Sequence, residues 1–279
     1  MISIAAESRP TTSCRTTRPD EASGHDASED KAAGRLASRH RTRARRAASC
    51  RIASRRAHLR TAFRLVYDAY VRSGLAEPNS FAVRVTPYHL LPTTEIYVAL
   101  DRAEVIGTVS LVRDGALGLP MEAIYPEEVA WRRMQGIRLA EVSCLADSHH
   151  ERGRRLPVVL QLMSFMAQCA RRRGVNELVI AVHPRHARFY HRFAAFHVIG
   201  DERRYHTVLD NPAVAMSLNL DRAPVEHARL YRTFFGTPLP EQDLKYRPIA
   251  EDVRSELRWI LERTRDRRPE PRRMLLAGV

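Results

Sequence analysis

A lone carboxylate on a predicted buried strand is the residue of this chain best suited to proton-transfer chemistry. Residues 139–146 read Leu-Ala-Glu-Val-Ser-Cys-Leu-Ala. Strand side chains alternate, so Glu141 and Ser143 share one face of that strand. A carboxylate that is partly removed from water can accept a proton from a substrate, directly or through a water molecule. The alternatives are a structural ion pair for Glu141, because the chain has many arginines, and a place in the core for Ser143.

The predicted strand that carries Glu141 opens a β-α-β-α unit. A long apolar helix is predicted over 158–169, a buried strand over 177–182 and an aromatic-rich helix over 185–196. A unit of this order makes its two strands parallel, usually with a right-handed connection. It sets a carboxylate beside a strand whose end opens onto a tyrosine-bearing helix. We interpret this arrangement as the core of an acyltransferase.

The rest of the chain supplies the elements that must position this unit. The periodicity predicts helices and strands in the order helix, hairpin, strand, helix, strand, helix, hairpin. This order predicts an α/β (α+β) protein with a mixed central sheet flanked by helices, similar to the GCN5-related N-acetyltransferase fold, and a helical C-terminal extension. The flanking elements are a helix over 58–73, a hairpin over 94–100 and 104–112, a short helix over 121–134 broken near Pro126, a strand pair over 197–208 and 213–220, and amphipathic helices over 225–235 and 249–263.

Composition divides the chain into four parts. Residues 1–57 contain 13 Lys and Arg against 6 Asp and Glu, are rich in Ser, Thr and Ala, and lack hydrophobic periodicity. Such a segment buries too little apolar surface to offset its ordering entropy, so we predict a disordered basic extension. We predict an acyltransferase domain over 58–222, helices packed on it over 223–264, and a loose Arg- and Pro-rich tail over 265–279. The basic extension is either a tether for an acidic partner or a segment without a role.

Several classes of protein are disfavoured by what the sequence lacks. No stretch approaches 18 apolar residues and the N-terminus has no apolar signal region, so neither a membrane span nor secretion is expected. Four cysteines without paired spacing indicate reduced thiols in a cytoplasmic protein. The adjacent His149 and His150 lack further ligands at metal-binding spacing, so no metal site is predicted.

Between about residues 62 and 220 the chain resembles the N-acyl amino acid synthases of the FeeM type, which are similar to the acyl-homoserine-lactone autoinducer synthases. The resemblance implies transfer of a long-chain acyl group from acyl carrier protein to the amine of an amino acid. It implies no tightly bound cofactor, because acyl-phosphopantetheine is the donor substrate. The matching strings, in order, are Leu65–Val71 (LVYDAYV), Leu90–Thr94 (LLPTT), Gly107–Val112 (GTVSLV), Gly118–Met121 (GLPM), Tyr125, Ala140–Ala146 (AEVSCLA) and His183–Tyr190 (HPRHARFY).

Two departures from related families narrow this expectation. Acetyltransferases that use coenzyme A carry a Gly-rich pyrophosphate turn before the helix, and residues 149–157 (HHERGRRLP) do not match it. A carrier-protein thioester has one phosphate on its pantetheine arm, so the missing turn favours that donor. Autoinducer synthases carry Glu-x-Ser-Arg on the central strand, and Cys144 stands in place of the Arg. This argues against their adenosylmethionine acceptor.

The resemblance also assigns candidate catalytic roles. Glu141 is the candidate general base for the amine, and Ser143 is placed to assist it. Tyr190 lies where the fold places a phenol near the departing sulfur, although its helix explains it equally as one member of an aromatic stripe. Backbone N–H groups of the Glu141 strand, where the strands splay apart, are the candidate oxyanion donors. A covalent acyl intermediate on Cys144 is a rival that needs a base not evident in the sequence.

Substrate contacts are expected around the same unit. His183 and Arg185 follow a strand end, where ligands gather in open sheets, and are candidates for the acceptor carboxylate or the pantetheine phosphate. Arginines before the long helix are candidates for contact with the acidic carrier protein: Arg152, Arg154 and Arg155. Met121 is expected to line the acyl tunnel, and Thr108 belongs to a matching string. Simple solvation or a place in the core competes with each assignment.

Two other functions stay open from the sequence. An acyltransferase of the same layout can serve another small amine, including homoserine-lactone-type or surface-polymer acceptors. A non-catalytic, basic-tailed binding module belongs to a different class. The basic extension has almost no aromatic residues for stacking on single strands, and the core offers no helix-turn-helix or zinc finger, so no specific nucleic-acid partner is expected.

Overall fold

The computed structural model of the chain describes residues 48–148 and 155–265. Most of the predicted extension, the His149-His150 pair and residues 266–279 of the predicted tail lie outside the described residues, whereas Arg265, the first residue of that tail, ends the last helix. Within the described part, no helix is long and apolar enough to cross a membrane.

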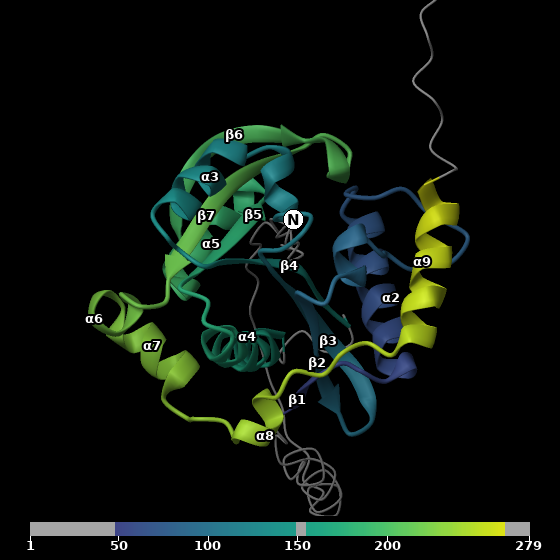
Figure 1. Cartoon of the computed structure of the whole chain (residues 1–279), viewed down its shortest axis with the longest axis horizontal. Coiled ribbons are helices and arrows are strands. Elements are labelled where there is room, and N and C mark those ends of the chain that lie inside the picture. The colour runs from purple at the N-terminus through teal and green to yellow at the C-terminus, as the bar shows by residue number, and fades with distance from the viewer. Residues whose placement is uncertain (1–47, 149–154, 266–279) are drawn as a thin grey trace, which may run out of the picture. The chain divides into compact units, whose positions relative to one another are not determined.

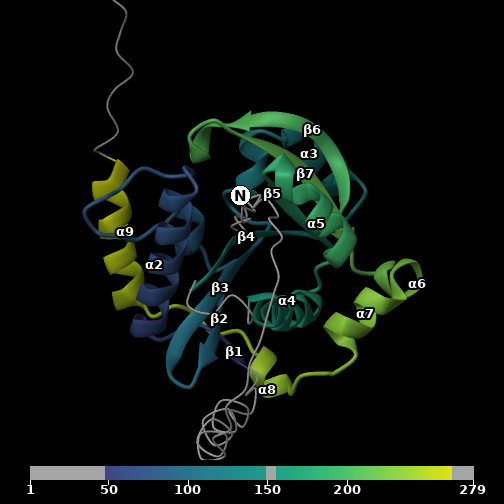
Figure 2. The same cartoon turned by 180° about the vertical axis from the view of Figure 1, so that it is seen from behind.

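Seven strands form one mixed sheet in the order β1-β2-β3-β4-β5-β7-β6 (Figures 1 and 2). Neighbouring strands are antiparallel except β4 and β5, which are parallel as the β-α-β-α unit predicts. The predicted mixed α/β class is confirmed. The bounds are β1 Ser49–Ile52, β2 Thr94–Asp101, β3 Glu104–Arg113, β4 Leu139–Asp147, β5 Glu177–Val182, β6 His197–Tyr205 and β7 Asn211–Asn219.

Helices cover both faces of the sheet. One face carries α2, α3 and α9, and the other carries α4, α5 and α7, as the two opposite views show (Figures 1 and 2). Two 3₁₀ turns, η1 (Pro87–Leu90) and η2 (Pro120–Ala123), precede β2 and α3. The helix bounds are α2 Arg56–Arg72, α3 Pro126–Met134, α4 Arg155–Arg172, α5 Pro184–Ala194, α6 Ala223–Glu226, α7 Ala228–Phe235, α8 Glu241–Leu244 and α9 Glu251–Arg265.

The parallel pair is short, and this opens the sheet at its centre. β4 pairs with β5 over three residues only, with Glu141 opposite Val179 as the last match. Beyond that point β4 continues beside β3 as far as Asp147, and β5 continues beside β7 as far as Val182. The two strands therefore part just after Glu141. The backbone of β4 that faces this opening has no partner strand among the described residues.

A β-bulge interrupts β4 beyond Glu141. Its pairing with β3 passes from Ser143 opposite Ser110 to Ala146 opposite Thr108, so β4 holds one extra residue there. Cys144 takes the left-handed conformation, with φ of 54°. The bulge brings two consecutive side chains, Ser143 and Cys144, to the same pocket. Strict alternation predicts opposite faces for them.

The prediction that the folded part starts at residue 58 is wrong. β1 (Ser49–Ile52) pairs with β2 and extends the sheet by a strand, and Ile52 and Ala53 are buried. This strand is too short to show the alternation by which strands are recognised, and its composition resembles that of the basic segment before it. The sequence therefore does not separate the two. The predicted helix over 158–169 is also longer in the structure, where it runs from Arg155 to Arg172.

Removing residues 1–56 is expected to destabilise the domain relative to a chain that starts at residue 48. The deletion takes away β1 and the buried side chains of Ile52 and Ala53, and burial of one aliphatic side chain of this size contributes about 1.5–3 kcal/mol. Urea unfolding of the two truncated chains measures the difference. Equal midpoints would show that β1 contributes nothing to stability.

Candidate active site

Glu141 is completely buried, with 0% of its surface exposed. Its Oε2 accepts a hydrogen bond of 2.7 Å from the backbone N–H of Met121, in η2. Its Oε1 is also buried and has no hydrogen-bond partner among the described residues. The carboxylate is thus fixed through one oxygen, while the other remains able to accept a proton.

Burial raises the pKa of Glu141 to about 7, because a charge removed from water is disfavoured. The hydrogen bond from Met121 acts in the opposite direction and is too weak to cancel this effect. None of the described arginines forms a salt bridge with Glu141, so the ion pair considered from the sequence is absent there. A carboxyl group with this pKa is partly ionised and partly protonated near neutral pH, and it can therefore both accept and release a proton, as a general base requires.

A large pocket lies on the Glu141 side of the sheet. Its volume is about 1010 Å³, and it is lined by α2, by the segment from residue 75 to η1, by β4 and by the end of β6. Ser143 and Cys144 form its β4 wall. Glu141 is not among the residues that line the pocket, but it lies close to it. The pKa values of the pocket residues Tyr88 and Tyr205 are raised first by the burial of their own phenols and second by the negative charge of Glu141.

Tyr190, in α5, is on the opposite face of the sheet. Its side chain is buried against the rings of Phe189 and Phe196, as the aromatic-stripe alternative predicts. Its hydroxyl, however, has no hydrogen-bond partner among the described residues, and burial raises the pKa of the phenol far above its usual range. The sequence places Phe189, Tyr190, Phe193 and Phe196 on that stripe, and of these Phe193 is 47% exposed.

His183 and Arg185 lie at the end of β5, outside the pocket. The Nδ1 atom of His183 accepts a 3.3 Å hydrogen bond from the backbone N–H of Arg185, so this imidazole caps α5. The exposed Arg185 side chain donates from Nε to His186 at 3.1 Å. Both residues flank the opening between β4 and β5. Their predicted contacts with substrate stay predictions.

The remaining candidates divide between structural positions and undescribed ones. The Thr108 hydroxyl is buried and donates to the carbonyl of Tyr97 at 3.0 Å, so the structure does not bring it to the pocket. Met121 is fully buried, is not among the residues that line the pocket, and contacts Glu141 through its backbone N–H. Arg152 and Arg154 lie outside the described residues, as does the side chain of Arg155. Among the described residues, no group of three His, Cys, Asp or Glu side chains is placed to hold a metal.

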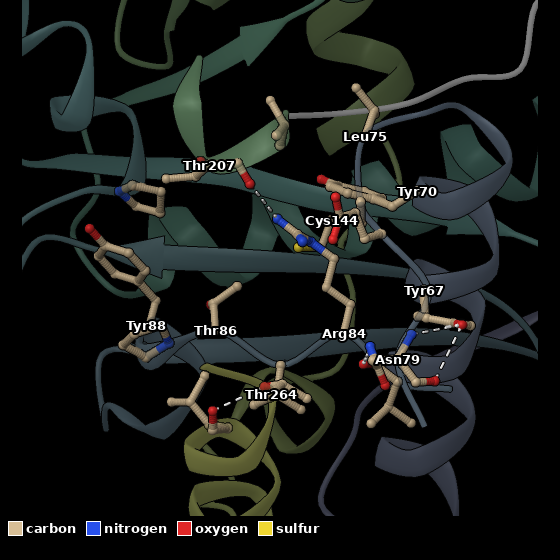
Figure 3. Close-up of a pocket in the computed structure, with 18 of the residues that line it drawn as sticks. Tyr67, Tyr70, Leu75, Asn79, Arg84, Thr86, Tyr88, Cys144, Thr207 and Thr264 are labelled. Atoms are coloured by element: carbon tan, nitrogen blue, oxygen red, sulfur yellow. Dashed lines mark hydrogen bonds between the residues drawn. The ribbon is translucent and has the colours of Figure 1, made fainter. Parts of the chain in front are cut away.

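The structure adds pocket residues that the sequence did not reveal. Arg84 and Tyr88 line the cavity with Tyr67 and Tyr70 of α2 (Figure 3), and Tyr205 of β6 lines it as well. The first two stand in an irregular segment between α2 and β2, where no periodicity indicates which side chains point inward. The sequence strings that contain Tyr70 and Tyr125 indicate the family, but they do not indicate which side chains line a pocket.

Comparison with known proteins agrees with this fold. The family model for the N-acyl amino acid synthase FeeM matches residues 61–219. The solved structure of FeeM, an N-acyl amino acid synthase from uncultured soil microbes, is 31% identical, covers 62% of this chain and 95% of its own, and superposes with a TM-score of 0.54. No curated protein matches the chain significantly.

Two acyl-homoserine lactone synthases share the fold at low identity. The CoA-dependent synthase MesI is 14% identical and covers 69% of this chain and 97% of its own, with a TM-score of 0.50. The synthase LasI is 15% identical and covers 70% of this chain and 97% of its own, also with a TM-score of 0.50. The region that the FeeM family model matches contains β4, β5 and the buried Glu141. The chain therefore belongs to the N-acyl amino acid synthase FeeM family of acyltransferases.

Proposed function

We propose that this protein transfers a long-chain acyl group from acyl carrier protein to the amine of an amino acid, with Glu141 as the general base. The observation that carries the proposal is a buried carboxylate with a pKa of about 7, placed where β4 and β5 part, in a chain of the N-acyl amino acid synthase FeeM family. The geometry supports aminolysis of a thioester because it offers a buried base beside a strand edge that is unpaired among the described residues.

The first step is attack by the amine. An amino acid carries an ammonium group at neutral pH, which must lose a proton before its nitrogen can attack. Oε1 of Glu141, free of other partners among the described residues, accepts that proton directly or through a water molecule. The neutral nitrogen then adds to the thioester carbonyl carbon, and the carbonyl oxygen takes the negative charge.

The second step breaks the carbon–sulfur bond. The oxyanion is stabilised by backbone N–H groups of β4 that face the opening, because no strand among the described residues pairs with that edge. When the carbonyl re-forms, the thiolate of phosphopantetheine leaves and takes the proton of the Tyr190 hydroxyl. The nitrogen, which still carries one proton more than an amide nitrogen, gives that proton through water to the Tyr190 phenolate and so restores the phenol. In this proposal the thioester lies in the opening, with Glu141 acting from the α2 side of the sheet and Tyr190 from the α4 side. The products are an amide and a free thiol.

A carrier-protein donor is supported by charge near the opening. Helix α5 begins where β5 ends and presents three exposed arginines at helical spacing: Arg185, Arg188 and Arg192. None forms a salt bridge with a described acidic side chain. Carrier proteins are acidic, so this row suits electrostatic docking. The sequence before α4 also lacks the pyrophosphate turn of coenzyme A enzymes.

The deciding experiment supplies the purified protein with acyl carrier protein and coenzyme A thioesters of one chain length, and with a panel of amino acids. Mass spectrometry of the extract identifies the products. We expect N-acyl amino acids, formed faster from the carrier-protein thioester. Faster reaction with coenzyme A would overturn the donor, and no N-acyl amino acid from either thioester would overturn the function.

Tyr190→Phe is expected to lower kcat by about 10- to 100-fold with an alkyl thioester, because the leaving thiolate loses its proton donor. The loss should shrink with an aryl thioester, whose thiolate needs no protonation to depart. Phe193→Leu, at an exposed site of the same helix, is the matched control and should keep normal activity. An equal loss with both thioesters would show that Tyr190 acts only through packing.

A further inference from the structure

Arg84 lines the large pocket and has no acid partner among the described residues. It lies between α2 and η1, is half-buried, and has no carboxylate within salt-bridge distance among the described residues. Its Nε is buried and has no hydrogen-bond partner there. An arginine that is held partly out of water with no acid partner and an unsatisfied Nε is costly to keep, and this state indicates an anionic ligand that completes it.

The surroundings hold the Arg84 guanidinium in place. Its Cζ lies 4.4 Å from the centre of the Tyr70 ring, and Nη2 donates to the carbonyl of Thr207 at 3.5 Å. Figure 3 shows the side chain reaching from its segment toward Thr207 and Tyr70. The backbone is fixed as well, because the N–H of Arg84 donates to the carbonyl of Phe63 in α2 at 3.1 Å. The cation is therefore positioned before any ligand arrives.

Other charges at the pocket do not compete with Arg84. Glu77 is exposed. Arg263 is exposed and stacks on Trp259, with 4.0 Å between its Cζ and the ring centre. His206 is exposed and pairs with Asp210 at 2.6 Å. Arg84 is thus the lining cation that is both partly withdrawn from water and unpaired with an acid among the described residues.

Arg84 and Glu141 act on the same stretch of the pocket. Tyr205 lies within the field of both groups, since the Glu141 charge raises its pKa and the Arg84 charge lowers it, after burial as the main cause. Tyr205 also donates to the carbonyl of Pro120 at 2.7 Å, next to the Met121 N–H that holds Glu141. Arg84 and Glu141 therefore both lie near Tyr205, on the same side of the sheet, where one small molecule can bind Arg84 at one end and present its amine to the base.

We infer that the acceptor is recognised by its carboxylate, which Arg84 binds within the pocket formed by α2 and the end of β6. This inference rests on the proposed function and deepens it. A guanidinium binds a carboxylate through two parallel hydrogen bonds, which fixes orientation as well as position. The adjoining wall, which includes Tyr67, Leu75 and Phe81, gives the side chain of the acceptor an apolar surface. An amine without a carboxylate lacks this anchor.

The test compares three acceptors with one donor: an amino acid that the enzyme accepts, its methyl ester, and the amine that its decarboxylation gives. In the wild-type enzyme, kcat/KM for the amino acid should exceed both others by about 10- to 100-fold, as expected for a charge-assisted pair. Arg84→Gln should remove that preference by raising KM for the amino acid alone. Arg84→Lys should restore part of it.

The controls separate the possible outcomes. Arg263→Gln, which removes an exposed charge at the same pocket, should keep the preference. Wild-type enzyme that acylates all three acceptors equally, or an Arg84→Gln variant that loses all three equally, would overturn the inference and leave the function intact. A wild-type enzyme that acylates none of them contradicts the proposed function itself. The wild-type comparison needs no variant, so poor folding of Arg84→Gln does not affect it.

Discussion

Glu141→Gln is expected to lower kcat/KM by about 10²- to 10⁴-fold, the range for loss of a general base. Glutamine has nearly the same shape, and its carbonyl oxygen can accept the hydrogen bond that Met121 donates at 2.7 Å. The fold is therefore kept, while the group that receives the amine proton is lost. Steady-state kinetics with acyl carrier protein thioester measures the effect. Glu127→Gln, at an exposed position of α3, is the control, and full activity of Glu141→Gln would remove this residue from the mechanism.

The same variant should change the pH profile. Only ionised Glu141 accepts a proton, and its pKa is raised to about 7, so wild-type kcat/KM should rise as pH passes through about 7. The residual activity of Glu141→Gln should lack that step. A profile with no inflection near neutral pH in the wild-type enzyme would contradict the assignment.

The raised pKa also has a consequence for stability, with a definite sign. The folded protein binds the proton of Glu141 more tightly than the unfolded chain, whose carboxyl titrates near 4.5. Stability should therefore fall as pH rises from about 4.5 to about 7, by on the order of 3 kcal/mol. Glu141→Gln should be more stable than wild type at pH 8, and urea unfolding at pH 5 and pH 8 measures the difference.

Breaking the ion pair between Glu95 and Arg173 is expected to have the largest effect on stability. The pair is bidentate, with Nη2 to Oε1 at 2.7 Å and Nε to Oε2 at 3.0 Å. The side chains are only 1% and 10% exposed, and Arg173 also donates to the carbonyl of Leu244 at 2.7 Å. Arg173→Leu leaves a buried carboxylate without its cation, which costs about 3–5 kcal/mol.

Thermal and urea unfolding check this expectation. Arg172→Leu is the matched control, because its partner Glu241 is 80% exposed, and it should unfold like the wild-type protein. The double variant Glu95→Leu with Arg173→Leu should recover part of the loss, since no charge is then stranded. A single variant as stable as the control would show that the pair is solvated in solution.

The sequence predicted the fold well because its signals are local. Apolar periodicity located the hairpin β2–β3, the helix α4 and the strand β5, and chain order alone made β4 and β5 parallel. β1 was not predicted, because a four-residue edge strand carries too few side chains to show alternation. Its pairing with β2 depends on residues about 50 positions later in the chain, which no local pattern encodes.

The site was predictable only in part, for a related reason. Glu141 stood out as a carboxylate on an otherwise apolar strand, and the structure places it in the core beside the opening. Arg84 did not stand out, because one arginine among many in an irregular segment has no distinctive neighbours in sequence. Its meaning arises from contacts with Tyr70 and Thr207, which lie on other elements. That Arg84 has no acid partner among the described residues can be seen only once the chain is folded.

The bulge in β4 reverses the parity of the strand. Before it, the even-numbered Ala140 and Val142 pack with the α4 side; after it, the odd-numbered Leu145 does so, and Cys144 and Ala146 turn to the α2 side. A shortening of β4 by one residue at this point would remove the bulge and restore regular alternation, so that Leu145 and Ala146 keep their sides and the pocket loses one of its two consecutive β4 side chains. Relatives should therefore conserve the length of this strand more strictly than its side chains, and glycine or asparagine should be the easiest replacements at position 144, where φ is 54°.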